Sequence, residues 1–375
     1  MRNTPLGWAA KNGHEEVVKI LLGRDDIDPN KPGEYGQTPL SLAACYGHEG
    51  VVGRLLAHDG IDPNKPAEGG YTPLLEAIYN RHEAVVEILL RQDGTDPNKP
   101  GEEGETPLSA AVQCGLERVV KMLLGRDDVD PNKRGRDGET PLMWGVWNGN
   151  ETVVKILLGR DGINPNKAGM EGRTPLLLAT YLEKVGILKI LLGRDDVNPN
   201  TRDNDGQTPL FLAAMNGCEG VLRILLGRGD VTPDIPNNFR ETALSCAVRH
   251  GHEGVVEMLL RRDDVDPNNL DDYDRTPLWW AAWNWQAGMV KMLLGRDDVN
   301  PDRPDKDGQT PLFCAAKNGH EEVVELLLER DDVNPDKQDN KGQTALSRAS
   351  RNGHTSVIAL LQPRLNPKRH RPRMP

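Results

Sequence analysis

Apolar and polar positions recur along the chain with a fixed period of 34 residues. Each period begins with Thr-x-Leu; nine copies read Thr-Pro-Leu and two read Thr-Ala-Leu. Such regular self-similarity predicts an array in which every period folds into the same small element. The eleven threonines that mark the periods stand, without a slip in spacing, at positions 4, 38, 72, 106, 140, 174, 208, 242, 276, 310 and 344.

One period, residues 310–342, shows what each unit is expected to form. Thr310 followed by Pro311 is typical of a helix N-cap and the first helical residue. A short apolar helix follows, and Gly319 suits the left-handed residue that ends a helix. A second helix carries a stripe of valine and leucine on one face. Pro335 prevents that helix from continuing, so a turn-rich connector leads into the next period.

The motifs T-P-L-x-x-A-A, N-G-H and V-V-x-x-L-L resemble those of the ankyrin repeat, over residues 2 to about 362. The resemblance implies an all-α repeat solenoid of stacked helix–turn–helix ankyrin repeats with finger-like β-turn or hairpin connectors. The family's usual histidine after T-P-L is absent from every copy. The period of 34 and the near-identical copies with GRDDVDPNK joins are similar to the expanded arrays of fungal NLR-like proteins.

We expect one array over residues 1–362, whose first copy lacks its finger, and a basic, disordered tail over residues 363–375. In that first copy Trp8 and the following alanines match an internal repeat, which suggests that the chain begins within a longer protein or that another surface covers this end. The tail contains KRHRPR, a short basic cluster of the type that serves as a nuclear localisation or nucleic-acid-binding patch.

Charge and composition narrow the class of partner. The net charge is −11, and without the tail 41 basic residues face 57 acidic ones, a net charge of −16. This balance argues against nucleic acid on the array and against an anionic membrane surface. The chain has no apolar run of the roughly 18–20 residues that a membrane helix needs. The five cysteines form no CxxC pair, which is typical of a protein in a reducing compartment. We expect a monomeric cytoplasmic protein, and the basic tail would also allow a nuclear location.

No motif predicts catalysis, a cofactor or a metal. Six of the nine histidines recur at one position at the start of the second helix, which indicates a structural role. HEEVV lacks the second histidine of HExxH, and RDDVDPN lacks the central glycine and distal glutamate of a calcium loop. We therefore expect no enzyme activity, and we interpret the acidic segments as solvated turns on the convex side.

The tryptophans are sorted by their offset from the repeat threonine. Offset +4 is mostly apolar, which predicts that Trp280 is core, and offset +3 predicts that Trp279 packs between repeats. Trp285 stands where eight copies have glycine. We expect locally altered turns there, since a left-handed non-glycine residue costs about 1 kcal/mol. Trp285 then either covers the groove beside Trp283 or has no role. Two other copies that break the glycine rule carry Arg81 and Glu183.

Offset +7 varies among otherwise near-identical copies, so packing does not set it. In ankyrin repeats the equivalent positions line the concave face, and large aromatic residues and arginine are typical interface anchors. The alternative is single exposed aromatic residues without a partner, which are common. The predicted protein-binding stripe, extended by offset +8 and by the residue before the threonine, consists of Tyr46, Tyr71, Tyr79, Trp147, Tyr181, Leu182, Met215, Arg249, His250, Arg275 and Trp283.

The sequence thus predicts a non-catalytic protein–protein interaction scaffold that binds a partner protein in its concave groove. The acidic turns favour a partner with a basic patch. One alternative is the sensor array of a larger fungal NLR-like signalling protein with a nucleotide-binding domain upstream. Another is the substrate-recruiting part of a ubiquitin ligase.

Overall fold

The computed structural model describes residues 3–135 and 137–362, and the predicted tail over 363–375 lies outside them. The chain forms two compact units, Met1–Asn198 and Pro199–Pro375, which we describe separately as unit 1 and unit 2. The described residues contain 22 α-helices, two 3-10 turns and no strand, so the predicted all-α repeat fold is confirmed.

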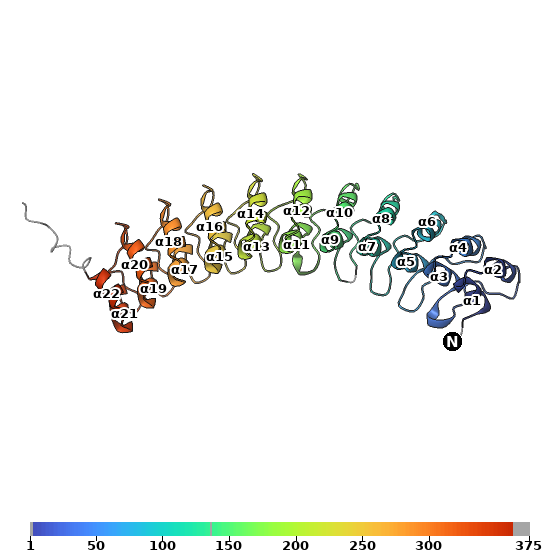
Figure 1. Cartoon of the computed structure of the whole chain (residues 1–375), viewed down its shortest axis with the longest axis horizontal. Helices are drawn as coiled ribbons and strands as arrows, with labels where there is room; N and C mark the ends of the chain where they lie inside the picture. The colour runs from blue at the N-terminus through green and yellow to red at the C-terminus, as the bar shows by residue number, and fades with distance from the viewer. Residues whose placement is uncertain (1–2, 136, 363–375) are drawn as a thin grey trace, which may run out of the picture. The chain divides into compact units, whose positions relative to one another are not determined.

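Each repeat contributes two short helices (Figure 1). Unit 1 contains α1 (Pro5–Lys11), α2 (Glu15–Leu22), η1 (Glu34–Gly36), α3 (Pro39–Cys45), α4 (Glu49–Leu56), α5 (Pro73–Tyr79), α6 (Glu83–Arg91), α7 (Pro107–Gln113), α8 (Glu117–Leu124), α9 (Pro141–Trp147), α10 (Glu151–Leu158), η2 (Met170–Gly172), α11 (Pro175–Tyr181) and α12 (Val185–Leu192). Unit 2 contains α13 (Pro209–Met215), α14 (Glu219–Leu226), α15 (Ala243–His250), α16 (Glu253–Leu260), α17 (Pro277–Trp283), α18 (Ala287–Leu294), α19 (Pro311–Asn318), α20 (Glu321–Leu328), α21 (Ala345–Asn352) and α22 (Thr355–Leu361).

The repeat threonine caps the first helix of every repeat, as predicted. The hydroxyl of Thr38, for example, accepts a hydrogen bond of 3.0 Å from the backbone N–H of Ser41. Proline follows the cap in the Thr-Pro-Leu copies, where its missing N–H has no helical partner to lose. In the copy beginning at Thr242, which has alanine instead, the hydroxyl of Ser245 accepts a bond of 2.9 Å from the cap's own N–H. A capping box thus replaces the proline there.

Stacking buries the apolar faces within each unit. First helices pack on the first helix of the next repeat, as α3 does on α5 and α15 does on α17, and second helices form a parallel layer beside them (Figure 1). The leucines, valines and alanines between the layers are almost completely buried. The recurring histidine adds a polar link, since Nε2 of His48 lies 2.9 Å from the carbonyl oxygen of Lys11 in the preceding repeat. The structural role predicted for this histidine is confirmed.

The acidic connectors also hold the stack together, which their interpretation as solvated turns missed. Nδ2 of Asn64 donates to the carbonyl oxygen of Gly94 at 2.6 Å, and its Oδ1 accepts from the N–H of Asp96 at 2.8 Å. The same two-way amide bridge recurs in both units, and we call it the asparagine ladder. Its other members are Asn30, Asn98, Asn132, Asn166, Asn200 and Asn268.

The expectation of altered turns at the three non-glycine positions is wrong. Arg81, Glu183 and Trp285 have φ values of 61°, 52° and 58°, the same left-handed conformation as the glycines of other repeats. The hydrogen bond that closes the turn is also kept, because the N–H of Gln286 donates to the carbonyl oxygen of Ala281 at 3.0 Å. The stack on both sides fixes the turn, so these residues accept the strain.

The fingers of the two units are built differently. In unit 2 the residue five before the threonine is Asp or Asn, and its side chain closes the finger; Oδ1 of Asp305 accepts from the N–H groups of Asp307 and Gln309 at 3.0 and 2.8 Å. In unit 1 the same position is glycine or alanine. Successive fingers of unit 2 are joined by one backbone hydrogen bond each, such as that from Asp272 N–H to the Phe239 carbonyl at 3.1 Å.

Candidate protein-interaction face

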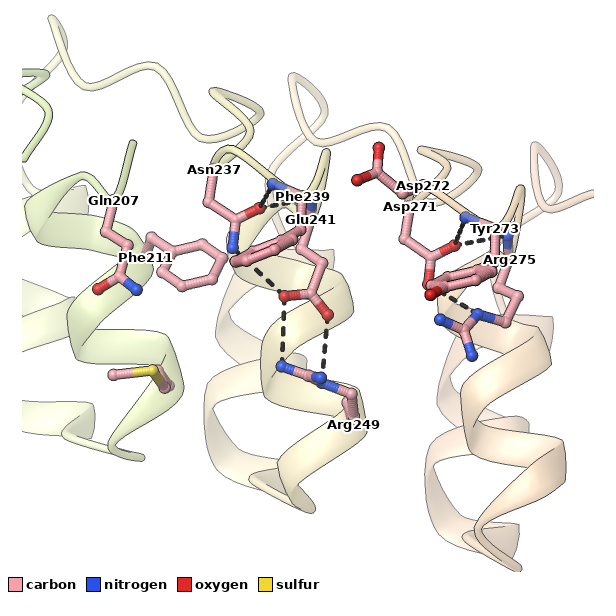
Figure 2. A pocket seen from close by; sticks show the side chains of 11 residues that line it. Gln207, Phe211, Asn237, Phe239, Glu241, Arg249, Asp271, Asp272, Tyr273 and Arg275 are labelled. Atoms are coloured by element: carbon pink, nitrogen blue, oxygen red, sulfur yellow. Dashed lines mark hydrogen bonds and ion pairs between the residues drawn. The ribbon is translucent and has the colours of Figure 1, made fainter. Parts of the chain in front are cut away.

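The first helices and the fingers of unit 2 enclose a cavity of about 510 Å³ on the surface that we call the groove face (Figure 2). Three successive repeats contribute to it, through helices α13 and α15 and the fingers that precede α15 and α17. The lining mixes aromatic, charged and amide side chains, namely Gln207, Phe211, Met215, Asn237, Phe239, Glu241, Arg249, Asp271, Asp272, Tyr273 and Arg275.

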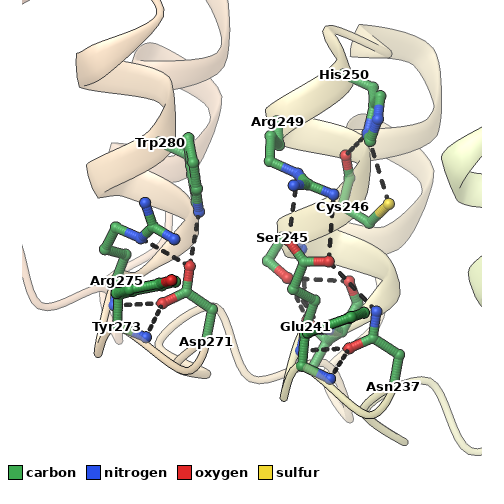
Figure 3. Close-up of polar contacts among 12 residues, drawn as sticks. Asn237, Glu241, Ser245, Cys246, Arg249, His250, Asp271, Tyr273, Arg275 and Trp280 are labelled. Atoms are coloured by element: carbon green, nitrogen blue, oxygen red, sulfur yellow. Dashed lines mark hydrogen bonds and ion pairs between the residues drawn. The ribbon is translucent and has the colours of Figure 1, made fainter. Parts of the chain in front are cut away.

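A buried ion pair forms one wall of this cavity. Glu241 is 7% exposed and binds Arg249 through both carboxylate oxygens. Nε of Arg249 lies 3.2 Å from Oε1 of Glu241, and Nη2 of Arg249 donates to Oε2 at 3.2 Å. Nδ2 of Asn237 adds a third donor at 3.3 Å, while Oδ1 of Asn237 accepts from the Glu241 N–H at 2.9 Å (Figure 3). The carboxylate is therefore charge-balanced, and one edge of the guanidinium is committed to it.

In the next repeat a different set of residues balances the charge of a buried finger carboxylate. Oδ2 of Asp271, which is 2% exposed, accepts from Nε of Arg275 at 2.8 Å and from the indole N–H of Trp280 at 3.2 Å (Figure 3). The Arg275 guanidinium lies 4.1 Å from the Trp280 ring centre. The prediction that Trp280 is core is wrong, because its ring is only half-buried and turns toward the finger to reach this carboxylate. Trp279, by contrast, is buried.

Two aromatic residues at the finger tips flank the cavity. Phe239 and Tyr273 are both 62% exposed, and both stand three residues before the repeat threonine. Neither residue belongs to the predicted stripe, which takes only the residue before the threonine from the fingers. A third aromatic residue at this offset, Tyr35 in unit 1, is also exposed, so sorting the finger residues by offset would have found all three.

Unit 1 has a smaller cavity of about 110 Å³ on its own groove face. The predicted stripe residues Tyr71 and Tyr79 meet there edge to face, with ring centres 5.7 Å apart. Burial raises the pKa of both phenols above the ordinary value, and the nearby carboxylate of Glu105 adds to the rise. The remaining lining residues are Glu103, Ser109, Gln113, Gly135, Asp137 and Trp144.

The structure thus gathers five of the eleven predicted residues into two cavities: Met215, Arg249 and Arg275 in unit 2, and Tyr71 and Tyr79 in unit 1. The other offset +7 residues are Trp147 and Tyr181, 43% and 45% exposed, and Trp283, which stacks on Trp279 with ring centres 5.2 Å apart. The offset +8 residues lie at the helix–helix turn outside both cavities, and they are Tyr46, Leu182 and His250.

Trp285 does not extend the stripe. Its ring is 65% exposed and stacks on His320 of the next repeat, with centres 5.7 Å apart and planes 1° from parallel. Trp283 instead stacks on Trp279 and has the Lys317 ammonium 5.0 Å from its ring centre. The two tryptophans therefore belong to separate clusters.

Three further findings concern metal binding, nucleophilic chemistry and membrane insertion among the described residues. They contain no group of three or more His, Cys, Asp or Glu placed to hold a metal. Burial raises the pKa of the Cys246 thiol to about 12, which makes it a poor nucleophile at neutral pH. No helix among residues 3–135 and 137–362 is long and apolar enough to cross a membrane.

Stacked helix pairs with fingers define a helical-repeat interaction module, and the comparisons with known proteins identify its family. A family model described as ankyrin repeats (3 copies) matches residues 6–101, 93–169, 162–235, 229–305 and 287–369. The chain belongs to the ankyrin repeat family. Among solved structures, it is similar to the ankyrin repeat domain of Bcl-3, described as a unique member of the IkappaB protein family. That match has 26% identity and a TM-score of 0.55, and it covers 60% of this chain and 99% of the other. The sequence comparison with curated proteins gives no match.

Proposed function

We propose that this chain binds a partner protein on its groove face, with the two cavities as the principal contact points. Ankyrin repeats generally mediate protein–protein interaction, and the fold is typically a non-enzymatic module. The observation that carries the proposal is the unit 2 cavity, in which exposed Phe239 and Tyr273 stand beside a charge-balanced arginine. Rigid aromatic rings around a pocket are typical anchors of protein interfaces.

The predicted stripe is part of this proposal. Trp147 and Tyr181 expose large rings on unit 1, and Met215 and Arg249 line the unit 2 cavity. A partner that carries basic residues would complement the net charge of −11. We propose a monomer in the cytoplasm, with nuclear entry through the basic tail.

The test combines capture with reconstitution. Partners captured from native extract are identified, produced in pure form, and titrated against the parent chain, a Phe239→Ala/Tyr273→Ala variant and a Trp147→Ala/Tyr181→Ala/Trp283→Ala variant. The control is Trp285→Ala, which removes an equally exposed aromatic ring that belongs neither to the two cavities nor to the predicted stripe. The proposal predicts at least a tenfold loss of affinity in the first two variants and none in the control. Equal affinity for all four proteins would refute it.

Two narrower functions are proposed as alternatives, and only the first rests on the resemblance of the repeats to known arrays. One is the sensor array of a fungal NLR-like signalling protein, which a phosphate-binding loop encoded upstream of Met1 would support. The other is the substrate-recruiting part of a ubiquitin ligase, which an adaptor-binding motif encoded beside this array would support.

A further inference from the structure

Glu105 in unit 1 and Glu241 in unit 2 occupy the same position, directly before the repeat threonine. In unit 2 the chain itself supplies a guanidinium, because Arg249 at offset +7 binds Glu241 through both oxygens. In unit 1 offset +7 is Gln113. A third glutamate at this position, Glu139, accepts a hydrogen bond of 3.1 Å from the N–H of Met170, so among the described residues Glu105 is the copy that has neither an arginine at offset +7 nor a donor.

The Glu105 carboxylate has no hydrogen-bond partner. The residue is only 9% exposed, and both of its oxygens are buried and unbonded. It also lacks the amide that supports Glu241, since Gly101 stands at the position of Asn237. A side chain on Gly101 would collide with Oε1 of Glu105, so the glycine leaves space for the carboxylate without binding it. A buried charge without a partner is strongly unfavourable, which favours any ligand that supplies donors.

The surroundings of Glu105 suit a cation. The cavity of about 110 Å³ exceeds the roughly 30 Å³ that one water molecule occupies in the liquid, so it can admit a group of several atoms. Tyr71 and Tyr79 present perpendicular rings beside it, and aromatic faces attract guanidinium groups. Among the described lining residues Glu103 and Asp137 are further acids and none is basic.

We propose that the cavity beside Glu105 is a docking site for an arginine side chain of the partner protein, which takes the place against Glu105 that Arg249 takes against Glu241. The inference rests on the proposed function and specifies the partner's chemistry. Arginine fits better than lysine, because a planar guanidinium can bind both carboxylate oxygens at once and stack against a ring. In unit 2 Arg249 of the chain already binds Glu241, so the partner's arginine binds in unit 1.

The test uses the full chain labelled with 3-fluorotyrosine, whose six tyrosines give separate fluorine signals that Tyr→Phe variants assign. The probe is the peptide acetyl-Gly-Gly-Arg-Gly-Gly-amide, compared with the same peptide carrying citrulline, a neutral isostere. We expect arginine to shift the Tyr71 and Tyr79 signals with a dissociation constant on the order of 1–10 mM, as suits a one-side-chain ligand. Citrulline should bind at least tenfold more weakly.

Two variants and one control locate the site. Glu105→Gln removes the charge, and Gln113→Arg supplies a guanidinium from the chain itself, so each should weaken arginine binding at least tenfold. Glu117→Gln removes one charge from an exposed position in the same repeat and should leave binding unchanged. The proposal is overturned if arginine and citrulline bind alike, if no shift occurs up to about 20 mM, or if Glu105→Gln still binds. The peptide measurement needs no partner, so its failure is distinct from a failure of groove binding.

Discussion

The asparagine ladder has two defective rungs, and repairing one should stabilise unit 2. Asp302 stands at a ladder position, where its Oδ2 accepts from the N–H of Asn334 at 2.8 Å but no amide donates onward. Its Oδ1 is buried without a partner. Asp302→Asn adds one side-chain donor, a net gain of about 0.5–1.5 kcal/mol, and removes an unsatisfied buried acceptor. Because Asp302 is only half-buried, we expect about 1–2 kcal/mol in total.

The pH dependence of the stabilisation by Asp302→Asn is a second, independent test of this prediction. Burial raises the pKa of Asp302 above the ordinary value of 3.8. A raised folded-state pKa means that the group favours folding while it is protonated, and that this contribution is lost as the pH rises through the raised value. The advantage of Asp302→Asn should therefore be larger at pH 7 than at pH 4.

The assay is thermal and urea unfolding of the full chain, compared by midpoints because repeat arrays need not unfold in two states. Asp302→Asn should raise the melting temperature of unit 2 by about 2–6 °C at pH 7. The reverse change at an intact rung, Asn268→Asp, should lower it by a similar amount, and Asp331→Asn at an exposed site controls for net charge. A midpoint for Asp302→Asn no higher than that of Asp331→Asn would show that the ladder amide contributes nothing.

Two further changes test the turn strain and the buried ion pair. Glu183→Gly should raise the free energy of unfolding by about 1 kcal/mol, because glycine relieves the left-handed backbone. Trp285→Gly should gain little, since it also loses the stack on His320, worth about 0.5–1.5 kcal/mol; urea midpoints that rise equally for both would contradict this. Arg249→Ala should destabilise unit 2 by about 2 kcal/mol, less than a fully buried pair because the Arg249 side chain is 37% exposed. Adding Glu241→Gln should restore most of the stability that Arg249→Ala loses. Faster amide exchange at residue 241 in the Arg249→Ala variant, and not in the double variant, would confirm this prediction.

The sequence was sufficient to predict most features that depend on the period, although not the asparagine ladder. The threonine caps, the glycine helix ends and the histidine links repeat with the helices, so one decoded repeat describes nearly all of them. Prediction failed where the orientation of a side chain depends on one particular neighbouring residue. Trp280 was assigned to the core because its offset is usually apolar, yet the finger carboxylate of Asp271 draws its indole outward. No average over copies contains that contact.

The fingers show why the candidate site was only half predicted. Offset +7 and the residue before the threonine were included in the predicted stripe, but other positions that complete each cavity lie on the fingers, at offsets −5 and −3. The side chain at offset −1 differs between repeats: it is Glu105 in one repeat, Glu241 in another and Arg275 in a third. Each choice changes whether a buried charge is balanced within the chain or left for a ligand. Near-identical repeats can therefore present different sites, because several positions that line the groove face vary between repeats while the caps and links of the stack recur.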